Sequence, residues 1–93
     1  MEREQLIDTA RLLAHAMRTG RHNRDVRVHN YKTGTEDPWP TALTDENVAS
    51  FLPRRNPYVG RAQALYRDAR EEGDNPQQAL ARVVRWIEQE LAL

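Results

Sequence analysis

The C-terminal stretch, residues 75–93, has the clearest periodic pattern of apolar and polar positions in the chain. At the helical rotation of about 100° per residue, its large aliphatic side chains fall on one stripe. These side chains are Leu80, Val83, Val84, Ile87 and Leu91. Asn75 is a favoured N-cap residue, and Pro76 at the first helical position sacrifices no hydrogen bond. We therefore predict a helix over residues 76–92, with its stripe facing the core and Trp86 at the edge of that stripe.

Residues 2–19 show a second helical pattern, which Gly20 ends. The apolar face consists of Leu6, Ala10, Leu13, Ala14 and Met17, with Ile7 at its flank. His15 projects from the opposite side, so we expect it to be exposed. Leu12 also lies off the main face, and it is either a single exposed leucine or part of a second contact surface.

Two further helices are predicted in the second half of the chain. Thr44 is a suitable N-cap for a helix over residues 44–52, which Pro53 ends, and Val48, Phe51 and Leu52 should face inward. Asn56 and Pro57 repeat the start signal of the last helix and predict a helix over residues 57–72. Its inward-facing residues are expected to be Tyr58, Ala62, Leu65 and Ala69. This helix and the last one should form an antiparallel pair.

Residues 25–32 alternate between apolar and polar positions, which is the period of a half-buried strand. The following segment contains Pro38 and Pro40, which remove hydrogen-bond donors and argue against a returning strand. We therefore interpret residues 25–32 as an extended loop over the helices. The alternative is an edge strand that pairs with a second copy of the chain. Trp39 should anchor the loop on the helical core.

These patterns predict a single all-α domain over residues 1–93. It has four helices, at about residues 2–19, 44–52, 57–72 and 76–92, with an irregular and possibly short-stranded connection after the first. The chain contains no cysteine, so neither disulfides nor cysteine-bound zinc can stabilise it. Its stability must come from packing.

Charge and hydropathy narrow the range of partners. Fourteen basic and fourteen acidic residues give a formal net charge of zero, so no overall field attracts nucleic acid or membrane. No apolar run reaches the ~20 residues that span a bilayer, and residues 1–5 are too charged for a signal peptide. We expect a cytoplasmic protein with no membrane partner.

One local charge feature stands out between residues 18 and 32, where five basic residues face one acid, Asp25. Arginine recurs there at every third position, and Tyr31 could add stacking with a nucleic-acid base. A second basic pair precedes the predicted third helix, where backbone amides also favour anions. The candidate partner-binding residues are therefore Arg18, Arg21, Arg24, Arg27, Tyr31, Arg54 and Arg55.

Catalytic and cofactor-binding patterns are not recognisable in the sequence. Ser50 is the single serine, and no base is positioned beside it in a nucleophile motif. His15, His22 and His29 are spaced seven apart, but Gly20 interrupts the helix that would align them as metal ligands. The glycines are too far apart for a phosphate loop. We expect no enzyme activity, no metal and no cofactor.

These considerations favour a non-enzymatic protein–protein interaction module, such as a small subunit, adaptor or regulator. It would bind another protein, or itself as a homodimer, through exposed apolar surface and the basic segment. The alternative is a nucleic-acid-binding regulator that uses residues 18–32 together with a helix-turn-helix-like segment over residues 44–72.

Overall fold

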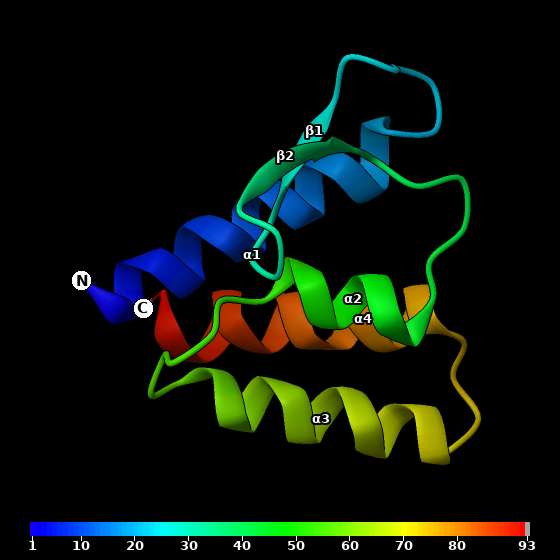
Figure 1. Cartoon of the computed structure of the whole chain (residues 1–93). Helices are drawn as coiled ribbons and strands as arrows, with labels where there is room; N and C mark the ends of the chain where they lie inside the picture. Colours follow the sequence, from blue (N-terminus) through cyan, green and yellow to red (C-terminus); the bar gives the residue numbers. More distant parts are fainter. Residues whose placement is uncertain (93) are drawn as a thin grey trace.

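The structure is a computed structural model that describes residues 1–92 (Figure 1). Its elements, in chain order, are α1 (Glu2–Thr19), β1 (Arg27–Asn30), β2 (Thr35–Pro38), α2 (Asp45–Phe51), α3 (Val59–Glu71), α4 (Pro76–Trp86) and a final π-helical turn, η1 (Ile87–Leu91). The domain is small and mostly helical, but it is not all-α, because the two strands form an antiparallel sheet.

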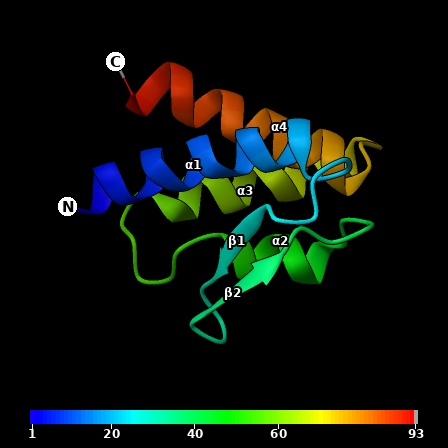
Figure 2. The same cartoon turned by 90° about the horizontal axis from the view of Figure 1, so that it is seen from above.

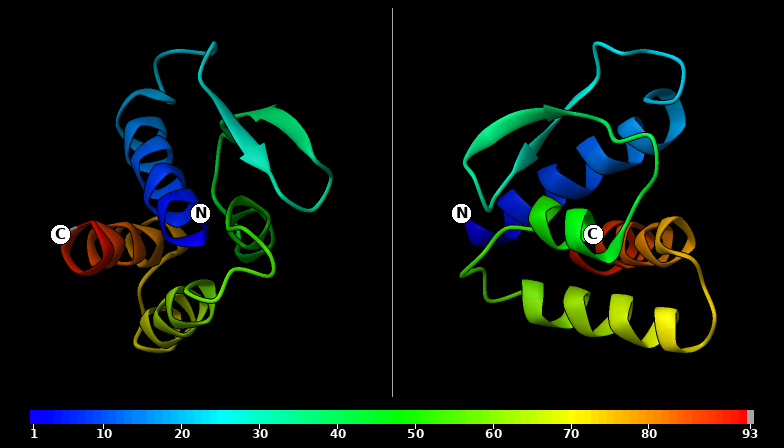
Figure 3. Two further views of the ribbon diagram at one scale, coloured as in Figure 1. Left: turned by 90° about the vertical axis from the view of Figure 1, so that its left-hand side faces the viewer. Right: turned by 45° about the vertical axis from the view of Figure 1, so that its right-hand side comes forward.

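Helices enclose one hydrophobic core (Figures 1 and 2). α3 and α4 form the predicted antiparallel pair, and α2 also runs antiparallel to α3, so that all three are seen nearly end-on in the left view of Figure 3. Four of the five predicted stripe residues of the last helix, Leu80, Val83, Val84 and Ile87, are buried, and the fifth, Leu91, is half-buried. Trp86 is half-buried at the edge of the core, as predicted.

The face that α1 buries is rotated slightly from the predicted one. Leu6, Ala10 and Leu13 are buried as expected. Thr9 and Ala16 are also buried, while the predicted Ala14 and Met17 are only half-buried. The rotation follows from contacts on two sides, because α1 packs against α4 and η1 and also against β1. His15 is exposed as predicted, and Leu12 is 56% exposed.

The extended loop predicted for residues 25–32 is wrong, because β1 pairs with β2 in a hairpin. The register runs from Arg27 opposite Pro38 to Asn30 opposite Thr35. Pro38 occupies the last pair, where a missing donor costs the ladder little. The turn closes through the Asn30 side chain, whose Oδ1 accepts the N–H groups of Lys32 and Thr33 at 2.9 and 3.1 Å, and Gly34 supplies a positive φ of 74°.

The hairpin is not a free arm, because its inner side is part of the core. Val28 is only 2% exposed. The Tyr31 N–H donates to the Ser50 carbonyl of α2 at 2.7 Å. Trp39 anchors the end of β2, as predicted, by stacking on Phe51 at a ring-centroid distance of 5.7 Å.

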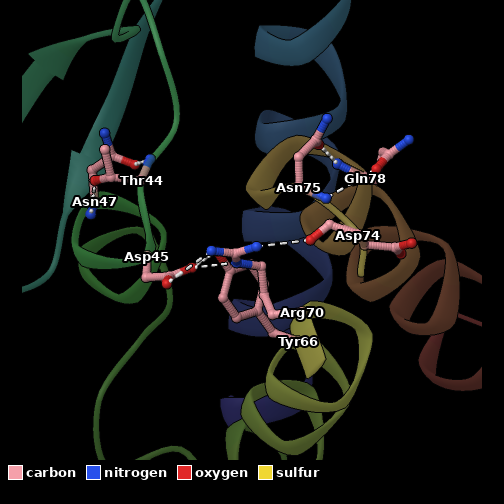
Figure 4. Close-up of polar contacts among 8 residues, drawn as sticks. All are labelled: Thr44, Asp45, Asn47, Tyr66, Arg70, Asp74, Asn75 and Gln78. Carbon is pink, nitrogen blue, oxygen red and sulfur yellow. Dashed lines mark hydrogen bonds and ion pairs between the residues drawn. The ribbon is translucent and has the colours of Figure 1, made fainter. Parts of the chain in front are cut away.

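The start signals of two helices are confirmed, and both are capping boxes (Figure 4). At α2, Thr44 and Asn47 exchange backbone-to-side-chain hydrogen bonds of 2.9 and 3.2 Å. At α4, Asn75 and Gln78 do the same at 2.9 and 2.8 Å. Each box satisfies two backbone donors that the helix would otherwise leave unpaired.

The predicted start of the third helix at residue 57 is wrong, since α3 begins at Val59. Asn56 does not cap α3 but links two segments. It is 5% exposed, its Oδ1 accepts the Tyr58 N–H at 2.9 Å, and its Nδ2 donates to the Glu2 carbonyl at 2.7 Å and to Gln5 Oε1 at 3.0 Å. Consequently Val59 is buried, whereas Tyr58 is 38% exposed rather than inward-facing. The last helix also departs from expectation, because it widens into η1 after Trp86.

Candidate functional site

The most connected polar group in the fold joins α2 to α3 (Figure 4). Asp45 Oδ1 accepts hydrogen bonds from the Tyr66 hydroxyl at 2.5 Å and from Arg70 Nε at 2.8 Å. Arg70 also donates to the Asp74 carbonyl at 2.8 Å. The hydrogen bonds from Arg70 and Tyr66 lower the pKa of Asp45, while partial burial and the same carboxylate raise the pKa of Tyr66.

This group is a structural latch rather than a binding site, because its charges are already matched. Asp74 extends it to α4 through an ion pair between its Oδ2 and Arg82 Nε at 2.7 Å. That contact lies off the N–H direction, so Oδ2 gains the opposite charge without an aligned hydrogen bond. No unpaired charge is left in the latch for a ligand.

A pocket of about 710 Å³ opens instead where the end of α1 meets the base of the hairpin. We call it the hairpin-base pocket. It is lined by Gly20, Arg21, Asn23, Arg24, Pro38, Trp39, Pro40 and Thr41. Two chain segments therefore form it: the turn that leaves α1 and the proline-rich segment that leaves β2. Figures 1 and 2 show these segments close together at one end of the molecule.

Trp39 forms the rigid wall of this pocket. Its ring is half-buried and stacks on Phe51 with an interplanar angle of 23°. A Cβ atom placed on Gly20 would lie 2.5 Å from Trp39 Cδ1, so the ring rests against the bare backbone of Gly20. The flanking Pro38 and Pro40 restrict the backbone on both sides. This wall is therefore preorganised.

The charge of the pocket comes from Arg21 and Arg24. Both side chains are exposed, and neither forms an ion pair within residues 1–92. None of the lining residues is acidic. Guanidinium groups suit bidentate contacts with carboxylate or phosphate. The hairpin-base pocket thus combines an apolar wall with two unmatched positive charges.

The other candidates from the sequence lie outside this pocket. Arg18 is exposed in the last turn of α1, and Arg27 is exposed on β1. Tyr31 is held by a hydrogen bond between its hydroxyl and Thr9 Oγ1 at 3.0 Å. Arg54 and Arg55 are exposed in the connection between α2 and α3, which Figures 1 and 2 place at the opposite end of the molecule. The two basic clusters therefore do not form one surface.

Sequence reasoning placed Trp39 on the core but missed its second role as a pocket wall. The segment Asp37–Thr41 contains the signal in retrospect, since a tryptophan between two prolines is both rigid and unable to retreat fully into a core. The sequence pattern did not reveal that Gly20 is the neighbour of Trp39. Gly20 and Trp39 meet because of the hairpin, and the hairpin was not predicted.

The helix-turn-helix interpretation has little geometric support. Residues 52–58 separate α2 from α3, whereas such units use a turn of about three or four residues. The two helices also run antiparallel, while a recognition helix crosses its partner steeply (Figures 1 and 3).

A shallower groove of about 330 Å³ lies between α1 and α4, lined by Met17, Ala81, Val84, Arg85, Glu88 and Gln89. Arg85 and Glu88 carry opposite charges, so the charged side chains of the groove cancel and it does not favour a ligand of either charge. Within residues 1–92, no group of three histidine or acidic side chains is placed to hold a metal ion, and no helix has the length and hydrophobicity to cross a bilayer.

Comparison with protein-family models, with curated proteins and with solved structures found no match to this chain. The geometry of the hairpin-base pocket is therefore the basis for inferring a function.

Proposed function

We propose that this chain is a non-enzymatic protein–protein interaction module, a small cytoplasmic subunit, adaptor or regulator. The observation that supports this proposal is the hairpin-base pocket, in which Arg21 and Arg24 stand unpaired beside the rigid ring of Trp39. Tryptophan and arginine are the residues most enriched at binding hot spots. A preorganised wall also lowers the entropy cost of binding.

The lining of the pocket favours binding over catalysis. Its side chains include no carboxylate, imidazole or thiol that could act as a base or nucleophile. The Thr41 hydroxyl has no neighbouring base in the lining to activate it.

Site-specific photocrosslinking tests the proposal. A benzoylphenylalanine at exposed Thr41, on the pocket, should give an adduct in native lysate that mass spectrometry identifies as one protein. The same group at exposed Gln63 on α3 is the matched control and should not give that adduct. The adduct should survive nuclease treatment, and the purified protein should re-form it. An adduct that nuclease removes, or one formed equally from position 63, would contradict the proposal.

The nucleic-acid alternative keeps one favourable observation, namely that unpaired arginines also suit phosphate. If it is correct, affinity should fall steeply with salt, with ~0.9 added to the log–log slope for each phosphate contact on duplex DNA. Changing Arg21, Arg24 and Arg27 together to Ala should then flatten this slope. We expect instead only weak binding to duplex or single strands at about 150 mM salt, because so few contacts can be made.

A further inference from the structure

We infer that the hairpin-base pocket recognises an acidic peptide segment of its protein partner, in which glutamate or aspartate side chains lie next to an apolar residue. This inference rests on the proposed function and specifies its ligand. The acidic side chains would bind Arg21 and Arg24, and the apolar residue would contact Trp39.

Charge complementarity supports the acidic part of the ligand. Arg21 and Arg24 have no ion-pair partner within residues 1–92, and no acidic residue lines the pocket. Arg70 and Arg82 are paired with Asp45 and Asp74, whereas several other surface arginines of the described chain are unpaired like those of the pocket. What distinguishes Arg21 and Arg24 is that both line one pocket that also contains Trp39. A carboxylate can take two parallel hydrogen bonds from a guanidinium group. The two arginines therefore provide sites for at least two carboxylates.

Trp39 supports the apolar part and the peptide character of the ligand. The ring offers apolar area that is only half-buried. Its indole N–H donates no hydrogen bond within the described chain, and it is not sealed in the core. A peptide carbonyl is the natural acceptor for such a donor. An extended segment can thus satisfy the indole N–H through its backbone while its side chains reach the arginines.

The surroundings of the pocket disfavour a nucleic acid as the ligand. Phe51 covers one face of Trp39, and the Tyr31 hydroxyl is hydrogen-bonded to Thr9, so at most one ring face is left to stack on a base. Single-strand binding sites normally stack successive bases on several aromatic rings. Glu36 and Asp37 immediately precede the lining residue Pro38 in the chain and give β2 negative charge, although their carboxylates contact His29, Asn30 and Thr35 within the hairpin. A long polyanion would meet this charge, whereas a short peptide can end before it.

Amide-resolved NMR titration with a defined probe tests the inference. The probe is a capped peptide, Gly-Leu-Glu-Glu-Glu-Glu-Gly, and its control has glutamine at the four glutamate positions. We expect shifts of the amides of residues 20–24, 39 and 41 with the glutamate peptide. Binding of the glutamine peptide should be at least tenfold weaker, because its charge-assisted contacts are lost. An oligothymidylate and inorganic phosphate are titrated under the same conditions.

Two double variants test whether peptide binding depends on the arginines of the pocket or on positive charge in general. Arg21→Gln with Arg24→Gln should weaken peptide binding by about tenfold, because two guanidinium contacts are lost. Arg61→Gln with Arg67→Gln removes the same charge from exposed positions on α3, away from the pocket, and should change the affinity by less than about twofold. Circular dichroism of both double variants establishes that each is folded.

Two outcomes would overturn the inference, and they differ in their consequence for the proposed function. Tighter binding of the oligothymidylate than of the peptide, sensitive to Arg21 and Arg24, would overturn both. A position-dependent protein adduct at residue 41, with no shift of the pocket amides by the glutamate peptide, would overturn the acidic ligand alone.

Discussion

Gly20 is the residue that allows α1 and Trp39 to approach each other. Its φ of −63° is ordinary, so conformational freedom does not explain the glycine. The reason is space, because an added Cβ would lie 2.5 and 2.6 Å from Trp39 Cδ1 and Cγ and 2.6 Å from the Ala16 carbonyl oxygen. Contacts this short require the ring to move, and Trp39 is fixed by Phe51 behind it.

Gly20→Ala should therefore destabilise the fold by ~1–3 kcal/mol, the usual cost of overpacking, and should change the Trp39 fluorescence. Gly60→Ala on α3 is the control, since a Cβ there meets nothing within 4 Å. Alanine should stabilise that helix by about 0.5–1 kcal/mol. Urea denaturation measures both changes. Equal effects of the two variants would show that Trp39 does not rest on Gly20.

Asp45 contributes a pH-dependent part of the stability. Hydrogen bonds from Arg70 and Tyr66 lower its folded-state pKa below the ordinary 3.8. A lowered carboxyl pKa stabilises the fold above the unfolded-state value, and this contribution is lost as the pH falls through the folded-state value. The relevant window therefore lies below about pH 4.

Asp45→Asn should lower the free energy of unfolding at pH 7, and its difference from the wild type should shrink as the pH falls from about 4 to 2. Glu46→Gln is the control, because Glu46 shares the first turn of α2 but not the hydrogen bonds of the latch. Urea denaturation across this pH range measures the difference. A difference in the free energy of unfolding between wild type and Asp45→Asn that stays constant with pH would contradict the role assigned to Asp45.

At the scale of elements, the two Asn-Pro sequences have different tasks. Asn75 caps its own helix and is exposed. Asn56 is buried and joins the α2–α3 connection to the first turns of α1, at positions 2 and 5. The same dipeptide thus starts a helix at Asn75, whereas at Asn56 it also contributes a hydrogen-bonded contact to a distant helix.

Asn56→Ala should cost ~1–3 kcal/mol, because it removes the two hydrogen bonds that the buried Asn56 amide donates to α1. Asn75→Ala should cost about 0.5–2 kcal/mol, the range for losing an N-cap. Hydrogen exchange separates the two: Asn56→Ala should expose amides of α1, and Asn75→Ala those of α4 alone. Loss of protection in α4 from Asn56→Ala, with none in α1, would contradict this assignment.

Ile87, where α4 passes into η1, belongs to the hydrophobic core. Ile87 is 0% exposed, and η1 packs against α1. Ile87→Ala should cost ~2–5 kcal/mol and Ile87→Val ~0.5–1.5 kcal/mol, since each leaves a cavity. His15→Ala on the exposed side of α1 should change little. Thermal melts rank the three variants, and a large loss from His15→Ala would be inconsistent with the observed rotation of α1.

At the scale of the whole molecule, little apolar surface remains for self-association. Among the described residues, the large hydrophobic side chains that are exposed are Met1, Leu12 and Tyr58. Pairing through the edge of β2 is disfavoured, because Glu36 and Asp37 would face like charges in an antiparallel copy and Pro38 lacks a donor. The homodimer stays a prediction, and it now depends on Leu12.

Sedimentation velocity at micromolar concentration tests this prediction. If Leu12 is the contact, the wild type should sediment as a dimer and Leu12→Asp as a monomer of 10.8 kDa. Ala49→Asp, at another exposed position, should leave the dimer intact. A wild type that sediments as a single 10.8 kDa species would remove self-association.

Features that depend on neighbours along the chain could be predicted before the fold was known. Helical periodicity identified the buried stripe of α4, and the caps at Thr44 and Asn75 were correct because a capping box closes within four residues. The exposure of His15 followed from the same periodicity.

Only the tertiary structure decided the features that join distant segments. Short strands depend on their partner and on burial, so the β1–β2 hairpin was invisible while Val28 had no known core to enter. The contact between the Asn56 amide and α1, more than fifty residues away in the chain, could not be read from the Asn-Pro pattern, which indicated only a local helix start. The hairpin-base pocket exists for the same reason. Arg21 and Arg24 stood out in the sequence, but Trp39 joined them because folding placed it against Gly20.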